Sequence, residues 1–107
     1  MNMKEMEINY KKYLIFKNKE EIKSWKETIQ EYKINIAELV LAEAKQEEIN
    51  KYVKFIKKHE EEIKAIELNI ANLIIEIDKL EKHIKEWEEE IKIQKYKEAP
   101  QGGQYEK

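Results

Sequence analysis

The sequence has no cysteine, no arginine, a single proline and only two glycines among its 107 residues. The absence of cysteine excludes disulfides, thiolate nucleophiles and cysteine-ligated metal sites. So few turn-forming residues are incompatible with a compact β-sheet fold, which needs many tight turns. The longest apolar runs, at residues 13–16 and 39–42, are far shorter than the ~20 residues of a membrane-spanning helix. Long amphipathic helices are the structure that fits these absences.

Charged residues make up 41% of the chain, and their types are few. All 21 basic residues are lysine, and Asp78 is the one aspartate among the 23 acidic residues. Lysine and glutamate are both good helix formers. The two signs are mixed along the chain and the net charge is -2, so we expect neither a nucleic-acid partner nor binding to a membrane. Residues 1–7 lack the apolar core of a secretory signal, and we expect a cytoplasmic protein.

Isoleucine recurs every seven residues in both halves of the chain. The second half carries this repeat at Ile49, Ile56, Ile63, Ile70, Ile77, Ile84 and Ile91, and the first half at Ile8, Ile15, Ile22, Ile29 and Ile36. Many residues three positions later are large and apolar, namely Trp25, Tyr32, Leu39, Ile66, Leu73, Leu80 and Trp87. This is the a/d pattern of a heptad repeat, and its length predicts a coiled coil.

The heptad phase breaks between Ile36 and Ile49, in the polar segment 43–48. The lost phase favours a connection between two helices. The segment contains no Gly, Pro, Asn or Asp, which instead favours one continuous, locally overwound helix. We predict an antiparallel pair, with the single helix as the alternative.

An antiparallel pair would bring Leu39 and Val40 near Val53, and residues 13–16 near residues 74–77. A further helix start is a candidate at Asn18, because Glu21 follows three residues later, as in a capping box. A helix interior with a chance glutamate is the other interpretation of Asn18.

The isoleucine stripe requires a covering surface, because long helices gain most of their stability by packing an apolar face. We expect oligomer or partner contacts at Ile22, Trp25, Ile29, Tyr32, Ile36, Leu39, Ile49, Ile56, Ile63, Ile66, Ile70, Leu73, Ile77, Leu80, Ile84, Trp87 and Ile91. Further apolar residues lie on flanking faces, at Ile34, Val40, Leu41, Leu68, Ile74 and Ile75. A two-helix seam would leave several of these exposed, which favours a dimer of hairpins that forms a four-helix bundle.

The predicted fold is therefore all-α: long amphipathic helices in an antiparallel coiled-coil hairpin or helical bundle that forms oligomers. Residues 1–97 form one helical domain, with the helix ending near Lys97. Residues 98–107 hold the proline and both glycines, and we expect a disordered tail there.

Two histidines are the main candidates for polar chemistry. His59 and His83 each precede a glutamate by three residues, Glu62 and Glu86, so each pair shares a helix face. His59 occupies a d position, and a polar residue in a coiled-coil seam more often sets register than binds metal. The acidic runs 60–62 and 88–90 are interleaved with lysines, which favours solvated helix faces.

The sequence contains no phosphate-binding loop, no catalytic triad pattern and no zinc-ligand spacing. We expect no cofactor, no metal and no enzymatic activity. The leading interpretation is a self-associating structural or adaptor protein that also contacts another protein. The alternative is a small inhibitor from a phage or mobile element that binds a host enzyme, such as one used in defence. The Ile- and Lys-rich composition fits the AT-rich genome of a bacterium or a phage.

Overall fold

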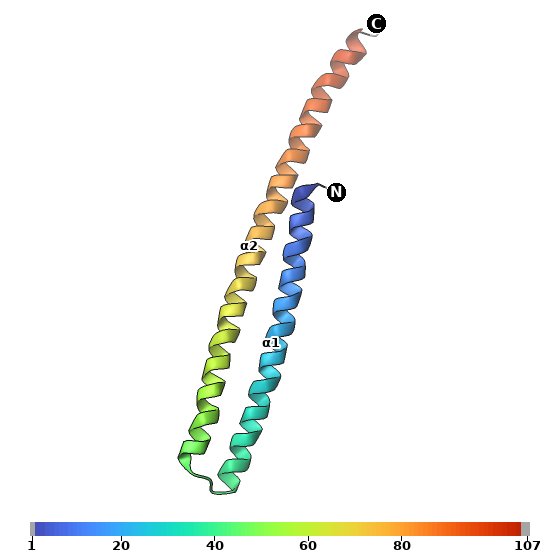
Figure 1. The fold of residues 1–107 in the computed structure, drawn as a ribbon. Coiled ribbons are helices and arrows are strands. Elements are labelled where there is room, and N and C mark those ends of the chain that lie inside the picture. Colours follow the sequence, from blue (N-terminus) through green and yellow to red (C-terminus); the bar gives the residue numbers. More distant parts are fainter. Residues whose placement is uncertain (1, 106–107) are drawn as a thin grey trace.

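The computed structural model describes the backbone of residues 2–105 and the side chains of residues 2–95. The described chain forms two helices, α1 (Met3–Leu41) and α2 (Gln46–Tyr105), which lie antiparallel (Figure 1). The molecule is a rod of 96 × 17 × 15 Å. The predicted all-α hairpin is confirmed, and the alternative of one continuous helix is wrong.

A capping box starts α1. The backbone N–H of Glu5 donates to Asn2 Oδ1 at 2.8 Å, and the backbone N–H of Asn2 donates to Glu5 Oε2 at 3.3 Å. These two bonds satisfy N–H groups that have no partner inside the helix. From there α1 continues through Asn18 without interruption, so the candidate helix start at Asn18 is wrong.

The reversal between the helices uses a Schellman-type C-cap. The N–H of Ala44 donates to the carbonyl of Leu39 at 2.9 Å, and the N–H of Glu43 donates to the carbonyl of Val40 at 3.1 Å. Glu43 adopts the left-handed conformation, with φ of 55°. Glycine usually fills this position, because a side chain there costs roughly 1–2 kcal/mol. The chain turns at residues 42–45, and α2 begins at Gln46, so residues 46–48 of the predicted break are helical.

The isoleucine stripe forms the seam between the two helices. All the buried apolar residues of the described chain occupy a or d positions, at Ile8, Ile29, Ile56, Ile63, Leu73 and Ile77. Ile29, Ile56 and Ile63 form the central cluster, and partly buried residues of α1 pack against it. Full burial of such a side chain contributes about 1.5–3 kcal/mol before ordering costs. The central residues of the heptad stripe are thus buried between the two helices of a single chain.

Contacts between distant residues define the register of the hairpin. Lys11 contacts Glu76, Trp25 stacks on His59, and the rings of Tyr32 and Tyr52 lie 5.7 Å apart. The first contact brings residues 13–16 to the level of the α2 segment that includes Ile74. The apolar side chains there divide between the seam and the surface: Leu73 and Ile77 are buried and Leu14 and Ile15 partly buried, whereas Tyr13, Phe16 and Ile74 are 52%, 58% and 54% exposed.

The second helix is the longer one, and it continues past the start of α1 (Figure 1). Its bounds reach Tyr105, beyond the expected helix end near Lys97. Side chains after Lys95 lie outside the described residues, and the predicted disorder of 98–107 stays a prediction.

A substitution of Glu43 tests whether the left-handed backbone conformation of the turn is strained. We expect Glu43→Gly to raise the free energy of unfolding by about 0.5–1 kcal/mol, because relief of the left-handed strain exceeds the greater chain entropy of glycine. Urea denaturation followed by circular dichroism, at one protein concentration, measures this. Glu31→Gly, at an exposed helical site, is the control and should lower stability by roughly 0.8–1 kcal/mol. Destabilisation by both changes would contradict this description of the turn.

Candidate functional site

The residues predicted as interface lie mostly along the intramolecular seam. Seven of them form or surround the central cluster, namely Ile22, Trp25, Ile29, Tyr32, Ile36, Ile56 and Ile63. Leu73 and Ile77 are also buried, and Leu39, Ile49, Ile66, Ile70, Leu80, Ile84 and Ile91 are partly buried. Trp87 differs, with 55% of its surface exposed. Most of the predicted contact surface therefore already packs against the other helix of the same chain.

His59 lies in an aromatic cluster formed by d positions of both helices together with Phe55 of α2. Its ring stacks on Trp25 at a centroid distance of 4.4 Å and an angle of 22°, and Tyr32 lies 5.8 Å away at 16°. Tyr52 and Phe55 contact Tyr32 from α2. Such offset and tilted aromatic pairs contribute about 0.5–1.5 kcal/mol beyond the area that they bury. The cluster fixes Trp25 opposite His59.

The polar atoms of His59 are only partly satisfied. Nδ1 lies 3.6 Å from Glu62 Oε2, which is an ion-pair distance when the ring is protonated, and the side chain is 12% exposed. Nδ1 is buried without a hydrogen-bond partner, as is Nδ2 of Asn18 on α1. A buried polar atom without a partner costs roughly 1–3 kcal/mol, so these positions favour one register rather than added stability.

Lys11 links the two helices from a d position. Its Nζ lies 2.8 Å from Glu76 Oε2 and 3.8 Å from Glu7 Oε1, and its side chain is 18% exposed. The hydrogen bond that Glu76 accepts and the charges of Glu76 and Glu7 raise the pKa of Lys11, and loss of hydration opposes them. The contact therefore stabilises the fold below the ordinary pKa of lysine and is lost as the pH rises through the raised value.

Metal binding has no geometric support in the described part of the chain. Among residues with described positions, no three His, Asp or Glu side chains gather where an ion could bind. His83 is exposed, and His59 is enclosed by aromatic rings and one glutamate.

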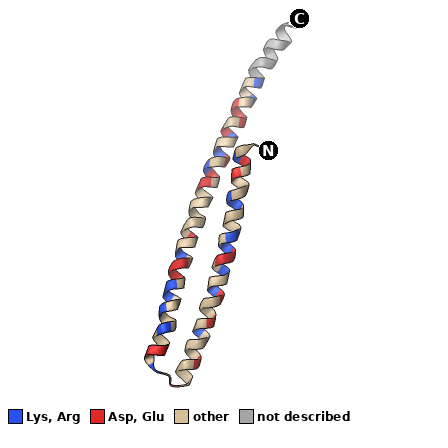
Figure 2. Ribbon diagram, in the orientation of Figure 1, with Lys and Arg blue, Asp and Glu red and all other residues tan. Residues whose placement is uncertain are grey.

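The outer faces of the hairpin carry apolar residues that the seam leaves exposed. All six flanking residues noted in the sequence are at least half exposed, and these are Ile34, Val40, Leu41, Leu68, Ile74 and Ile75. Charged residues are distributed along both helices (Figure 2), yet α2 has none between Glu67 and Glu76. An exposed apolar patch bordered by charge is typical of a contact surface.

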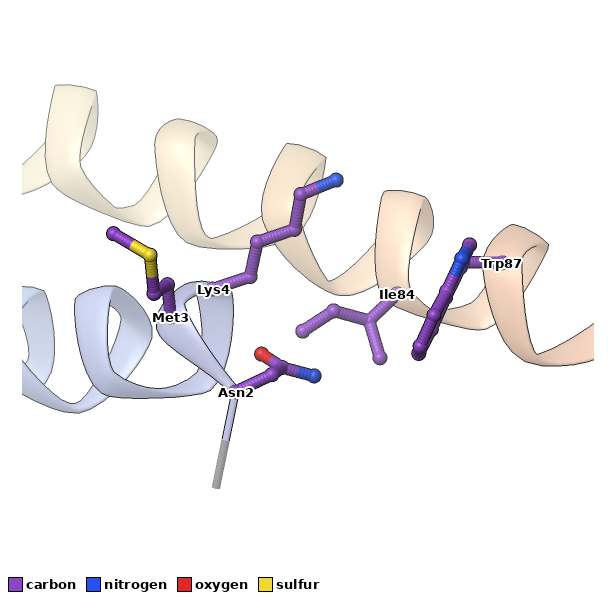
Figure 3. A pocket seen from close by; sticks show the side chains of 5 residues that line it. All are labelled: Asn2, Met3, Lys4, Ile84 and Trp87. Carbon is purple, nitrogen blue, oxygen red and sulfur yellow. The ribbon is translucent and has the colours of Figure 1, made fainter.

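A second exposed apolar site lies where α1 begins. Ile84 and Trp87 of α2 project toward Asn2, and Met3 and Lys4 complete a shallow notch of about 230 Å³ (Figure 3). The notch lies at the end of the seam, at the point where α2 continues without α1 beside it. Trp87 closes one side of it, which explains why this tryptophan is more exposed than Trp25.

None of the helices in the described chain is both long enough and apolar enough to cross a membrane. Comparison of the sequence with protein-family models, with curated proteins and with solved structures gives no match.

A double-mutant cycle tests whether the stacking of Trp25 on His59 stabilises the hairpin. Trp25→Ala, His59→Ala and the double variant should give a coupling energy of about 0.5–1.5 kcal/mol in urea denaturation, because each single change already removes the stack. The control cycle pairs Trp25 with the exposed His83, where the coupling should be close to zero. Equal coupling in the two cycles would show that the stack does not hold the helices together.

Proposed function

We propose that this protein is a non-enzymatic helical hairpin that self-associates and serves a structural or adaptor role, in contact with a further protein. The observation that carries this proposal is the balance between covered and uncovered apolar side chains. Six are buried in the described chain, whereas fifteen large ones are between 37% and 85% exposed. Two helices alone provide too little covering surface for this number of apolar residues.

The exposed residues favour a second copy as the simplest cover. Packing against another hairpin would bury residues on the outer faces, each contributing part of the ~1.5–3 kcal/mol of a fully buried side chain. Symmetric dimers are the commonest soluble oligomers, and two hairpins bring four helices together. The mixed charges that surround the apolar patches would set the orientation of such a contact.

The polar groups of the chain support a non-enzymatic role. A catalytic site needs an acid, base or nucleophile that faces a concave and partly dry pocket. Lys11 and His59 contact the opposite helix in the seam, and Asn18 is partly buried at a d position of α1. The notch beside Trp87 is shallow, and its one ionisable side chain is Lys4. The composition and the mixed charge favour a cytoplasmic protein of a bacterium or phage.

Sedimentation equilibrium tests self-association directly. We expect a mass of at least twice the 13.0 kDa of one chain in the micromolar range. Ile63→Val is the control: it should lower the free energy of unfolding by about 0.5–1.5 kcal/mol through the seam while the folded protein keeps the same mass. A mass of one chain throughout would contradict the proposal. A pull-down from bacterial lysate tests the alternative. If it recovers one host enzyme at equal stoichiometry and no further copies of this chain, the result would favour an inhibitor.

A further inference from the structure

The outer face of α2 carries a heptad series of its own. Each member follows a seam isoleucine by five residues, which places it about 140° around the helix and away from α1. The series is Lys54, Glu61, Leu68, Ile75, Lys82 and Glu89. All six residues are exposed, with Leu68 at 64% and Ile75 at 52%. The seam does not use this face.

When the series is aligned with its own reverse, apolar residues face apolar residues and charged residues face residues of the opposite charge. If a second α2 runs antiparallel, centred between Ala71 and Asn72, Leu68 faces Ile75 of the second copy. The same register places Glu61 opposite Lys82 and Lys54 opposite Glu89. Two-fold symmetry makes each of these contacts twice. Apolar residues thus meet at the centre and opposite charges meet toward both ends.

We propose that this outer face is a homodimer interface, on which α2 of a second copy packs antiparallel. The inference rests on the proposed self-association and specifies its surface, its register and its orientation. The segment 68–75 supplies an uncharged centre, and the small side chain of Ala71 allows close approach of the two helices. The charged residues on both sides determine which register and which partner fit.

Residues that flank the outer series of α2 would form two further kinds of contact in the dimer, one between opposite charges and one between like charges. Lys64 lies at the level of Asp78 of the second copy on one flank, which adds an opposite-charge pair. Lys57 lies at the level of Lys85 on the same flank, and this like-charge pair opposes association. Both positions are on the rim, where each pair contributes at most about 1 kcal/mol. The central series therefore dominates the preference.

Other pairings of the same hairpins fit less well. A parallel α2 pair sets every member of the series against itself, so that Lys54 faces Lys54 and Glu61 faces Glu61. The corresponding outer series of α1 is Met6, Tyr13, Glu20, Glu27, Ile34 and Leu41. Its antiparallel self-pairing places Glu20 against Glu27 at the centre. Charge complementarity consequently selects α2 over α1 and antiparallel over parallel.

The hairpin backbone permits this contact as it stands. Lys82 Nζ lies 3.1 Å from Asp78 Oδ2 within α2, so its side chain would turn from Asp78 toward Glu61 of the second copy. Because α1 packs on the opposite side of α2, the dimer would place four helices side by side, with the two α2 helices in the middle. The contact between residues 54 and 89 is about 50 Å long at 1.5 Å per residue.

Charge reversal tests the interface. Glu61→Lys and Lys82→Glu, each alone, create two like-charge contacts in the dimer, and each should weaken dimerisation by about tenfold at low salt. The double variant restores opposite charges and should recover the original Kd. Glu20→Lys, at the matching position of α1, is the control and should leave Kd unchanged. Sedimentation equilibrium measures Kd, and circular dichroism confirms the helical fold of each variant.

The outcomes separate this inference from the proposed function. A dimer that neither single reversal weakens, or that the double variant does not restore, would overturn the α2 interface and leave self-association standing. A monomeric unmodified protein would overturn both.

Spin labels report the orientation independently, since the chain has no cysteine of its own. Labels at Asn72→Cys should lie close together, and labels at Asn50→Cys should lie about 65 Å apart in the antiparallel dimer. Short distances at both sites would indicate a parallel pair and contradict the proposal.

Discussion

The fold depends on the burial of one isoleucine stripe between two antiparallel helices. Most helical stability in proteins comes from the packing of an amphipathic face, the sequence has no cysteine for a disulfide, and the described residues form no third helix that could support these two. Ile29, Ile56 and Ile63 at the centre of the seam provide the main favourable contact. The strained conformation of Glu43 persists because the packed helices determine the path of the turn.

A uniform apolar stripe does not by itself define how two helices align, because a shift by one heptad would again bring isoleucine beside isoleucine. The polar and aromatic residues of the seam remove this ambiguity. Lys11 reaches Glu76 from one level, and His59 stacks on Trp25 at another. A shift would leave Lys11 without Glu76 and would separate His59 from Trp25. These residues contribute specificity where further isoleucines would contribute only area.

The two faces of α2 differ in what surrounds them, because the inner face is covered by α1 and the outer face is exposed. The inner face packs on α1 and completes the monomer. The outer face combines an uncharged centre with charges whose order suits a second copy of the same helix, and association through it would leave the hairpin intact.

The all-α class, most of the seam residues and a break in the heptad phase close to the turn were predictable from the sequence, because heptad spacing places side chains on one helix face whatever surrounds them. The reversal at Glu43 was not decided by local sequence, since each residue of the segment 43–48 also suits a helix. The pairing of Lys11 with Glu76, the stacking at His59 and the exposure of the outer faces required the tertiary structure. These features join residues far apart in the chain, and their contacts exist only once the helices have packed in one register.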